Sequence, residues 1–161
     1  MAEQRRGRTY SRQRRLADDE LATWRAFIRA HATVTQRLER ELDEAGGLTL
    51  SELDVLLALD RAPGRTLRMN DLASRVILTK SGITRLVDRL EEQRFVARRI
   101  CLSDRRGYNA VLTAGGRVAI RRSIGTHLRG VAGAFADHID DRARPIVRAA
   151  LERIAAQAPA R

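Results

Sequence analysis

Apolar side chains recur every three or four residues along most of the chain, a period that predicts a mainly helical protein. The first such stretch runs from Asp18 to about Ala45, and Gly46-Gly47 is expected to end it. Its apolar stripe consists of Leu21, Trp24, Phe27, Ile28, His31, Val34, Leu38 and Leu42. A helix this long exposes more apolar surface than a small core covers, so we expect a second chain to pack against it.

A capping box precedes the next amphipathic stretch. Thr49 and Glu52 have the spacing in which each side chain bonds the other residue's backbone N–H. This pattern predicts a helix from Leu50 to about Arg61, which the Pro63-Gly64 pair stops.

Two further short helices are expected with a tight turn between them. Asn70 is expected to cap a helix over residues 71–76, and Thr79 a helix over residues 80–94 after a turn at Ile77-Leu78. Two helices joined in this way form a helix-turn-helix. The core residues expected from these three helices are Leu53, Leu56, Leu57, Leu59, Leu72, Ala73, Val76, Ile83, Leu86, Val87 and Leu90.

A β-hairpin is expected directly after the helix-turn-helix. Phe95–Ile100 and Tyr108–Leu112 read as strands, and Ser103–Gly107 is rich in turn residues and is expected to form the tip. We call this hairpin the wing. A helix-turn-helix followed by a wing is a winged helix, so the predicted fold class is mainly α with a small β-hairpin wing.

A long helix is expected to follow the wing, from Thr113 as its cap to about His138. It contains glycines, each of which weakens a helix interior by about 1 kcal/mol relative to alanine. These are Gly115, Gly116, Gly125, Gly130 and Gly133. Close packing in a dimer interface would stabilise such a helix, and a kink near Gly125 or Gly130 is the alternative.

The last helix is expected to be capped by Asp140 or Asp141, with Pro145 in its first turn, where proline is tolerated. Its stripe is Ile146, Val147, Ala150, Leu151 and Ile154. Together the patterns predict four regions of the chain. These are a flexible basic arm (1–16), an N-terminal dimerisation helix (17–47), a winged helix-turn-helix lobe (48–113) and C-terminal dimerisation helices (114–161).

The net charge suggests a polyanionic partner. The 161 residues include 31 basic and 20 acidic side chains, a formal charge of +11. Nucleic acid is the favoured partner, an anionic membrane surface is the alternative, and the charge could also serve only solubility. Nine basic and four acidic residues lie between Arg75 and Arg106, where the helix-turn-helix and wing are expected. The arm has six Arg and one Glu, and contact with phosphates and a solvated tail both remain open.

The residues offer no catalytic constellation, so we expect a protein that is not an enzyme. The single cysteine excludes an intrachain disulfide, and the three histidines lack metal-binding spacing, so we expect no metal and no cofactor. The longest uncharged run, Gly107–Gly116, is too short to span a bilayer. We therefore expect a cytoplasmic protein, associated with the nucleoid through DNA.

The polar face of the 80–94 helix has the chemistry for a major groove. Small residues near its start allow close approach, and Arg85 and Arg89 can reach guanine or phosphate. An ordinary amphipathic helix with a solvated face is the alternative. On the wing, Arg106 is expected to enter the minor groove and Arg105 to contact phosphate, while Asp104 orients a neighbouring Arg. The residues expected to bind DNA are Lys80, Ser81, Gly82, Thr84, Arg85, Arg89, Asp104, Arg105 and Arg106.

The run from Leu72 to Gly116 resembles the MarR family of bacterial winged-helix regulators. The matching pieces are Leu72-Ala73, Ser81–Arg85, Leu86–Glu91, Asp104–Arg106 and Leu112-Thr113-x-x-Gly116. The resemblance implies a homodimer whose terminal helices interlock and whose two winged lobes reach adjacent major grooves of a pseudo-palindromic operator. It also implies a transcriptional regulator, usually a repressor that releases DNA when it binds a small aromatic or phenolic ligand. Other members respond to thiol oxidation.

Arg94 departs from the family pattern, which usually has glycine there. A left-handed backbone at this position costs a non-glycine residue about 1 kcal/mol. Either Arg94 adopts it with strain, or the turn differs.

An effector site and a redox site are weaker expectations. Trp24 could stack on an aromatic ligand, with Asp54 and Arg85 or Arg89 as polar contacts, although Trp24 in the core and Asp54 on the helix surface are the favoured interpretations. The position of Cys101 differs from that of the family's thiol sensors. The alternatives to a ligand-responsive repressor are thus a thiol-redox-responsive regulator and a winged-helix module that binds protein rather than DNA.

Overall fold

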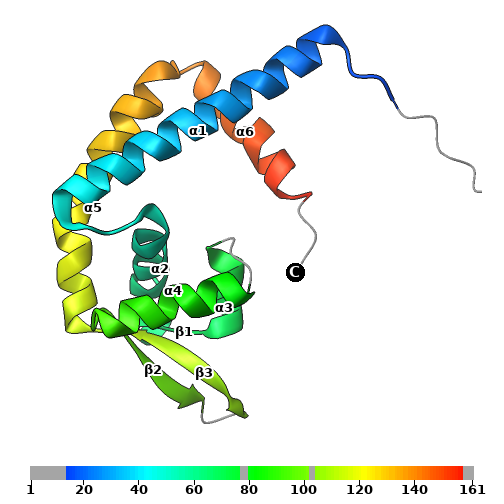
Figure 1. Cartoon of the computed structure of the whole chain (residues 1–161). Helices are drawn as coiled ribbons and strands as arrows, with labels where there is room; N and C mark the ends of the chain where they lie inside the picture. Colours follow the sequence, from blue (N-terminus) through cyan, green and yellow to red (C-terminus); the bar gives the residue numbers. More distant parts are fainter. Residues whose placement is uncertain (1–13, 77–79, 102–103, 158–161) are drawn as a thin grey trace, which may run out of the picture. The chain divides into compact units, whose positions relative to one another are not determined.

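The computed structural model describes residues 14–76, 80–101 and 104–157, and the statements below concern these residues. In chain order the elements are α1 (Asp18–Gly46), α2 (Leu50–Asp60), the short 3₁₀ helix η1 (Pro63–Arg65), β1 (Thr66–Arg68), α3 (Met69–Arg75), α4 (Lys80–Glu92), β2 (Val96–Cys101), β3 (Asp104–Leu112), α5 (Ala114–Ala134), η2 (Ala136–His138) and α6 (Ala143–Ala155) (Figure 1). The fold is mainly helical with one small antiparallel sheet, as predicted.

The chain divides into two compact units, residues 1–33 and 34–161, so that α1 contributes to both. In the first unit, α1 carries a row of aromatic rings. The ring centroid of Trp24 lies 6.0 Å from that of Phe27, which lies 6.3 Å from that of His31. Trp24 is 56% exposed, so the interpretation of this residue as part of the chain's own core is wrong.

In the second unit, the predicted capping box opens α2. The Thr49 hydroxyl accepts the Glu52 N–H at 3.2 Å, and the Glu52 carboxylate accepts the Thr49 N–H at 2.9 Å. Two N–H groups that the first turn leaves without helical partners are thereby satisfied. The start of α2 is therefore fixed by its own sequence.

The core joins α2, α3 and α4 to the sheet and to α5. The predicted apolar positions of the three helices are buried in it, except Leu57 and Val76, which are half-buried at its edge. Val96, Ala110 and Leu112 of the sheet complete it. The prediction of this core from helical spacing is confirmed.

The sheet has three antiparallel strands in the order β1-β3-β2, so β3 is central (Figure 1). Leu67 pairs with Ala110, and Val96 pairs with Leu112. The strand β1 was absent from the sequence prediction. It also explains why the predicted cap at Asn70 is wrong: Arg68 pairs with Asn109 in extended conformation, and α3 begins directly after it at Met69.

The helix α5 runs unbroken through Gly125 and Gly130, which excludes a break there, while the alternative of a kink stays a prediction. A Cβ atom at Gly130 would lie 2.7 Å from Leu38 Cδ2 of α1, which indicates that the missing side chain lets the two helices approach closely. The helix ends at Ala134 rather than His138, because Phe135 leaves helical geometry before η2 begins.

The start of α6 agrees with the prediction in part. The Asp140 carboxylate accepts the N–H groups of Arg142 and Ala143, at 2.9 and 2.8 Å, although the helix itself begins only at Ala143. Pro145 lies in the first turn. The apolar stripe is not covered within the chain, since Ile146 is 72% exposed and α6 has no buried residue.

Candidate nucleic-acid interface

The helix α4 separates an apolar face from a polar one. Ile83, Leu86, Val87 and Leu90 are buried against α2, α3 and the sheet. Thr84, Arg85 and Arg89 lie on the exposed side, and Gly82 is half-buried. Lys80 and Ser81 belong to the first turn of α4, as predicted. The expected cap Thr79 and the turn at Ile77-Leu78 lie outside the described residues.

Arg85 and Arg89 differ in their surroundings. Arg85 is exposed, and none of the ion pairs between described side chains involves it. The Nε atom of Arg89 lies 3.8 Å from a carboxylate oxygen of Glu52, and Glu52 is only 3% exposed. Because the other Glu52 oxygen bonds the Thr49 N–H, the cap of α2 also holds a charge partner for α4. Arg85 is therefore an exposed cation of this face that takes part in no ion pair among the described side chains.

Arg98 of β2 fastens the wing to α4. Its Nη1 atom lies 2.5 Å from a carboxylate oxygen of Asp88 and 3.4 Å from one of Glu91, and its Nη2 donates to the Thr84 carbonyl at 3.2 Å. The Arg98 N–H donates to the Glu91 carboxylate at 3.0 Å. Charge-assisted hydrogen bonds of this kind are directional, so they fix the angle between helix and wing.

Arg98 was absent from the predicted site residues. The signal that could have found it is the alternation along β2. Val96 points into the core, and side chains two residues apart on a strand share a face. Arg98 is therefore turned to the same side as Val96, toward α4.

The wing tip differs from the prediction. Asp104–Gly107 were expected in a loop, but β3 already begins at Asp104, which pairs with Cys101. The next pair is Ile100 with Tyr108, so β3 holds three more residues than β2 over this interval. Such a bulge lets pairing continue while the extra residues kink the strand. The extra residues are Arg105, Arg106 and Gly107, and the roles expected for Asp104, Arg105 and Arg106 stay predictions.

The turn between α4 and the wing settles the two possibilities for Arg94. Its φ is +61°, the left-handed region that favours glycine. The Arg94 N–H donates to the Glu91 carbonyl at 2.9 Å, and the Phe95 N–H donates to the Leu90 carbonyl at 2.8 Å. These two bonds form the Schellman motif that commonly ends a helix. The turn that the family pattern expects is thus present, and Arg94 is strained in it.

Asp54 lies on the exposed side of α2, as predicted. Burial of its carboxyl by neighbouring groups raises its pKa, and the negative charge of Glu39 adds to this, while His127 and Arg61 act in the opposite direction. His127 Nδ1 is buried and has no hydrogen-bond partner among the described residues. The effector site proposed for Trp24, Asp54, Arg85 and Arg89 stays a prediction, as does redox chemistry at Cys101, the last residue of β2.

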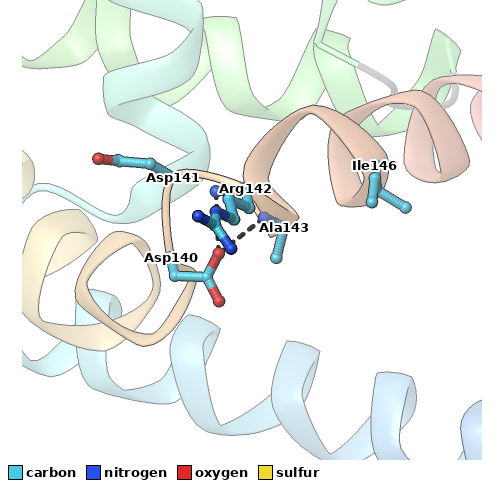
Figure 2. A pocket seen from close by; sticks show the side chains of 5 residues that line it. All are labelled: Asp140, Asp141, Arg142, Ala143 and Ile146. Carbon is cyan, nitrogen blue, oxygen red and sulfur yellow. Dashed lines mark hydrogen bonds between the residues drawn. The ribbon is translucent and has the colours of Figure 1, made fainter.

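Other candidate sites are few in the described part of the chain. A shallow hollow at the start of α6 is lined by Asp140, Asp141, Arg142, Ala143 and Ile146, and Figure 2 shows the Asp140 carboxylate bonded to the backbone there. No cluster of three or more metal-ligating side chains occurs among the described residues. No helix that the structure describes has the length and apolar character needed to cross a membrane.

The helices α3 and α4 form a helix-turn-helix, and α4 presents a polar face. The wing of β2 and β3 is bonded to α4, so this part of the chain is a winged helix-turn-helix. The sequence model of the MarR family matches residues 46–107. Among solved structures, the chain is similar to Sco3205, a MarR family transcriptional regulator from Streptomyces coelicolor whose crystal structure is in complex with DNA. The two sequences are 31% identical, and the match covers 89% of each chain with a TM-score of 0.86. AbsC, a MarR family transcriptional regulator from the same organism, is 33% identical with a TM-score of 0.83, over 89% of this chain and 96% of that chain.

A more distant structure shares the fold alone. BpsR from Bordetella bronchiseptica, described with the regulation of its DNA binding by 6-hydroxynicotinic acid, is 17% identical with a TM-score of 0.75, over 88% of this chain and 97% of that chain. No curated protein sequence matches the chain. On the likeness to Sco3205 and AbsC, the chain belongs to the MarR family of transcriptional regulators.

Proposed function

We propose that this protein is a sequence-specific regulator that binds double-stranded DNA through α4 in the major groove and the wing beside it. The observation that carries the proposal is the exposed Arg85 on the polar face of α4, opposite the buried Ile83, Leu86, Val87 and Leu90. An arginine fork reads guanine O6 and N7 in the major groove with two parallel hydrogen bonds. The crystal structure of Sco3205 with DNA supports the same use of the fold here.

The acting species is a homodimer on a pseudo-palindromic operator. Ile146 and Ile154 of α6, and Trp24 and Phe27 of α1, are exposed apolar residues on helices whose stripes one chain leaves uncovered. A second copy would bury them, and two lobes would then meet two half-sites on one face of the duplex. Binding at such a site blocks transcription, so we propose repression, which an effector relieves.

The test is selection of bound sequences from random duplexes, followed by affinity measurement on the selected site. Arg85→Ala should lower affinity for that site by about tenfold or more, because one bidentate base contact contributes about 1–3 kcal/mol. Arg61→Ala at the end of α2 is the matched control, since it removes the same charge from an exposed position outside α4, the wing and the terminal helices. Equal binding of every duplex by the parent protein, or an Arg85→Ala variant that binds like Arg61→Ala, would overturn the proposal. Sedimentation of the free protein as a monomer would overturn the dimer.

A further inference from the structure

Two large apolar side chains of the wing are left in solvent, directly opposite each other. Ile100 of β2 is 62% exposed, and its partner in the register, Tyr108 of β3, is 52% exposed. Directly opposed residues on antiparallel strands project to the same side. The two side chains therefore form one exposed apolar pair just before the bulge.

The pair lies on the side of the wing that faces α4. Val96 with Leu112, and Arg98 with Ala110, are the two preceding pairs on that side, because alternate residues of a strand share a face. Val96, Leu112 and Ala110 are buried in the core, and the Arg98 guanidinium bonds α4. Ile100 and Tyr108 continue this inner side beyond the core's edge, where the hairpin projects past the helices (Figure 1).

We propose that the Ile100–Tyr108 pair is a platform for the sugar–phosphate strand that separates the major groove from the minor groove, an inference that rests on the proposed function. With α4 in the major groove and the wing tip at the minor groove, the strand between the two grooves must cross the inner side of the wing. The carbon face of a deoxyribose packs on Ile100 and on the Tyr108 ring. The Tyr108 hydroxyl donates a hydrogen bond to a phosphate oxygen.

The charge around the pair favours this occupant over a protein surface. The wing from Val96 to Leu112 contains four arginines and one acidic residue, and Arg85 of α4 adds a further exposed cation. A phosphate strand is attracted to such surroundings. Two apolar side chains are too small a surface for a stable protein contact, which buries about 800 Å² on each partner.

This contact differs from an arginine contact in its dependence on salt. A tyrosine hydroxyl is uncharged, so it adds affinity without neutralising a phosphate or releasing a counterion. Contacts to the backbone also carry no base identity. The platform should therefore strengthen binding to every duplex by the same factor and leave the salt dependence of binding unchanged.

The experiment compares Tyr108→Phe and Ile100→Thr with the parent protein on the selected duplex and on an unrelated one, over a series of salt concentrations. Thermal unfolding checks that each variant folds. Tyr108→Phe should weaken binding to both duplexes by about tenfold, the loss of one hydrogen bond to a charged group, at an unchanged salt slope. Ile100→Thr should weaken both by a smaller, equal factor.

If both folded variants bind like the parent while Arg85→Ala loses affinity, the inference is overturned and the proposed function stands. If the variants change the oligomeric state instead of the affinity, the occupant is a second copy of the chain and the inference is again overturned. If the parent protein binds no duplex, both fail together.

Discussion

The Thr113 hydroxyl lies 2.7 Å from the carbonyl oxygen of Arg94 and ties the start of α5 to the turn that ends α4. The same oxygen accepts the Gly116 N–H at 3.0 Å, so that Thr113 is also the N-cap of α5, as predicted. The end of α4 and the start of α5 thus meet at one hydroxyl.

Gly116 is expected to tolerate no side chain at this junction. A Cβ atom there would lie 2.3 Å from the Phe95 carbonyl oxygen and 2.6 Å from Leu112 Cδ1, and the first of these is backbone that cannot turn aside. Gly116→Ala should therefore lower the free energy of unfolding by about 1–3 kcal/mol, the usual cost of overpacking. Urea unfolding of the purified variant measures it.

Gly125→Ala is the matched control in the same helix. A Cβ atom there would meet only the Arg129 side chain, at 3.5 Å, and Gly125 is exposed. This variant should gain up to about 1 kcal/mol from helix propensity. Equal effects of the two substitutions would contradict the close approach at Gly116.

Arg94→Gly is expected to stabilise the protein. The φ of +61° at Arg94 is strained for a side chain and free of strain for glycine. Removing the strain should raise the free energy of unfolding by up to about 1 kcal/mol. Arg94→Ala separates the causes, because it removes the guanidinium and keeps the strain. If alanine stabilises as much as glycine, the backbone is not the source of the effect.

The sequence was sufficient wherever the signal is local. The Thr49–Glu52 capping box involves neighbouring residues, so spacing alone predicts it. The buried face of α4 follows from the 3.6-residue period in the same way. The MarR family resemblance, carried by motifs in this region, is confirmed for the same reason. The left-handed turn at Arg94 was one of two possibilities that the family pattern left open.

Features that depend on distant pairing were missed. The strand β1 is three residues long and forms because β3 offers it an open edge. The two strands are far apart in the sequence, since Leu67 of β1 pairs with Ala110 of β3. The bulge that brings Arg105 and Arg106 into β3 depends on the register with β2. The contacts of Arg98 with Asp88 and Glu91 require the wing to be docked first. No single-segment pattern contains these facts.

Asp54→Asn is expected to stabilise the protein at neutral pH. Burial and Glu39 raise the pKa of Asp54 above 3.8 in the folded state, so the unfolded chain gives up this proton at lower pH than the folded chain. The charged carboxylate therefore costs stability above its folded pKa, and this cost disappears as the pH falls toward 3.8. Thermal unfolding of variant and parent across that pH range should show the stability advantage shrinking with acidification.

The control for this titration is Asp137→Asn, an exposed residue of η2 outside the ion pairs between described side chains. Its effect should stay within about 0.5 kcal/mol at every pH. An Asp54→Asn advantage that is constant with pH would assign the effect to packing rather than to charge.

Arg98 and Asp88 are expected to be energetically coupled. Their side chains meet at 2.5 Å, with Arg98 mostly covered and Asp88 about half exposed. A double-mutant cycle with Arg98→Gln and Asp88→Asn should give a coupling of about 0.5–1.5 kcal/mol, reduced from a buried pair by solvent screening. The readout is urea unfolding. Additive effects of the two substitutions would mean that the contact does not hold the wing to α4.

Arg106 is expected to contribute to DNA binding through its positive charge as well as through any contact with a base. It is one of three extra residues that the bulge inserts into β3 beside the wing tip, next to Arg105. Arg106→Ala should weaken binding to the selected duplex and reduce the slope of log affinity against log salt by about 1, because one phosphate-zone cation is lost.

The slope separates this role from the others proposed for the wing and α4. Tyr108→Phe should lower affinity at an unchanged slope, since its hydroxyl is neutral. Arg61→Ala should alter neither affinity nor slope, since Arg61 is exposed at the end of α2, outside α4 and the wing. A loss of affinity by Arg106→Ala with the parent's salt slope would therefore remove Arg106 from the phosphate zone. The duplex and the salt series are the same for all three variants, and the two arginine variants remove the same charge, so the comparison assigns the wing's contacts one residue at a time.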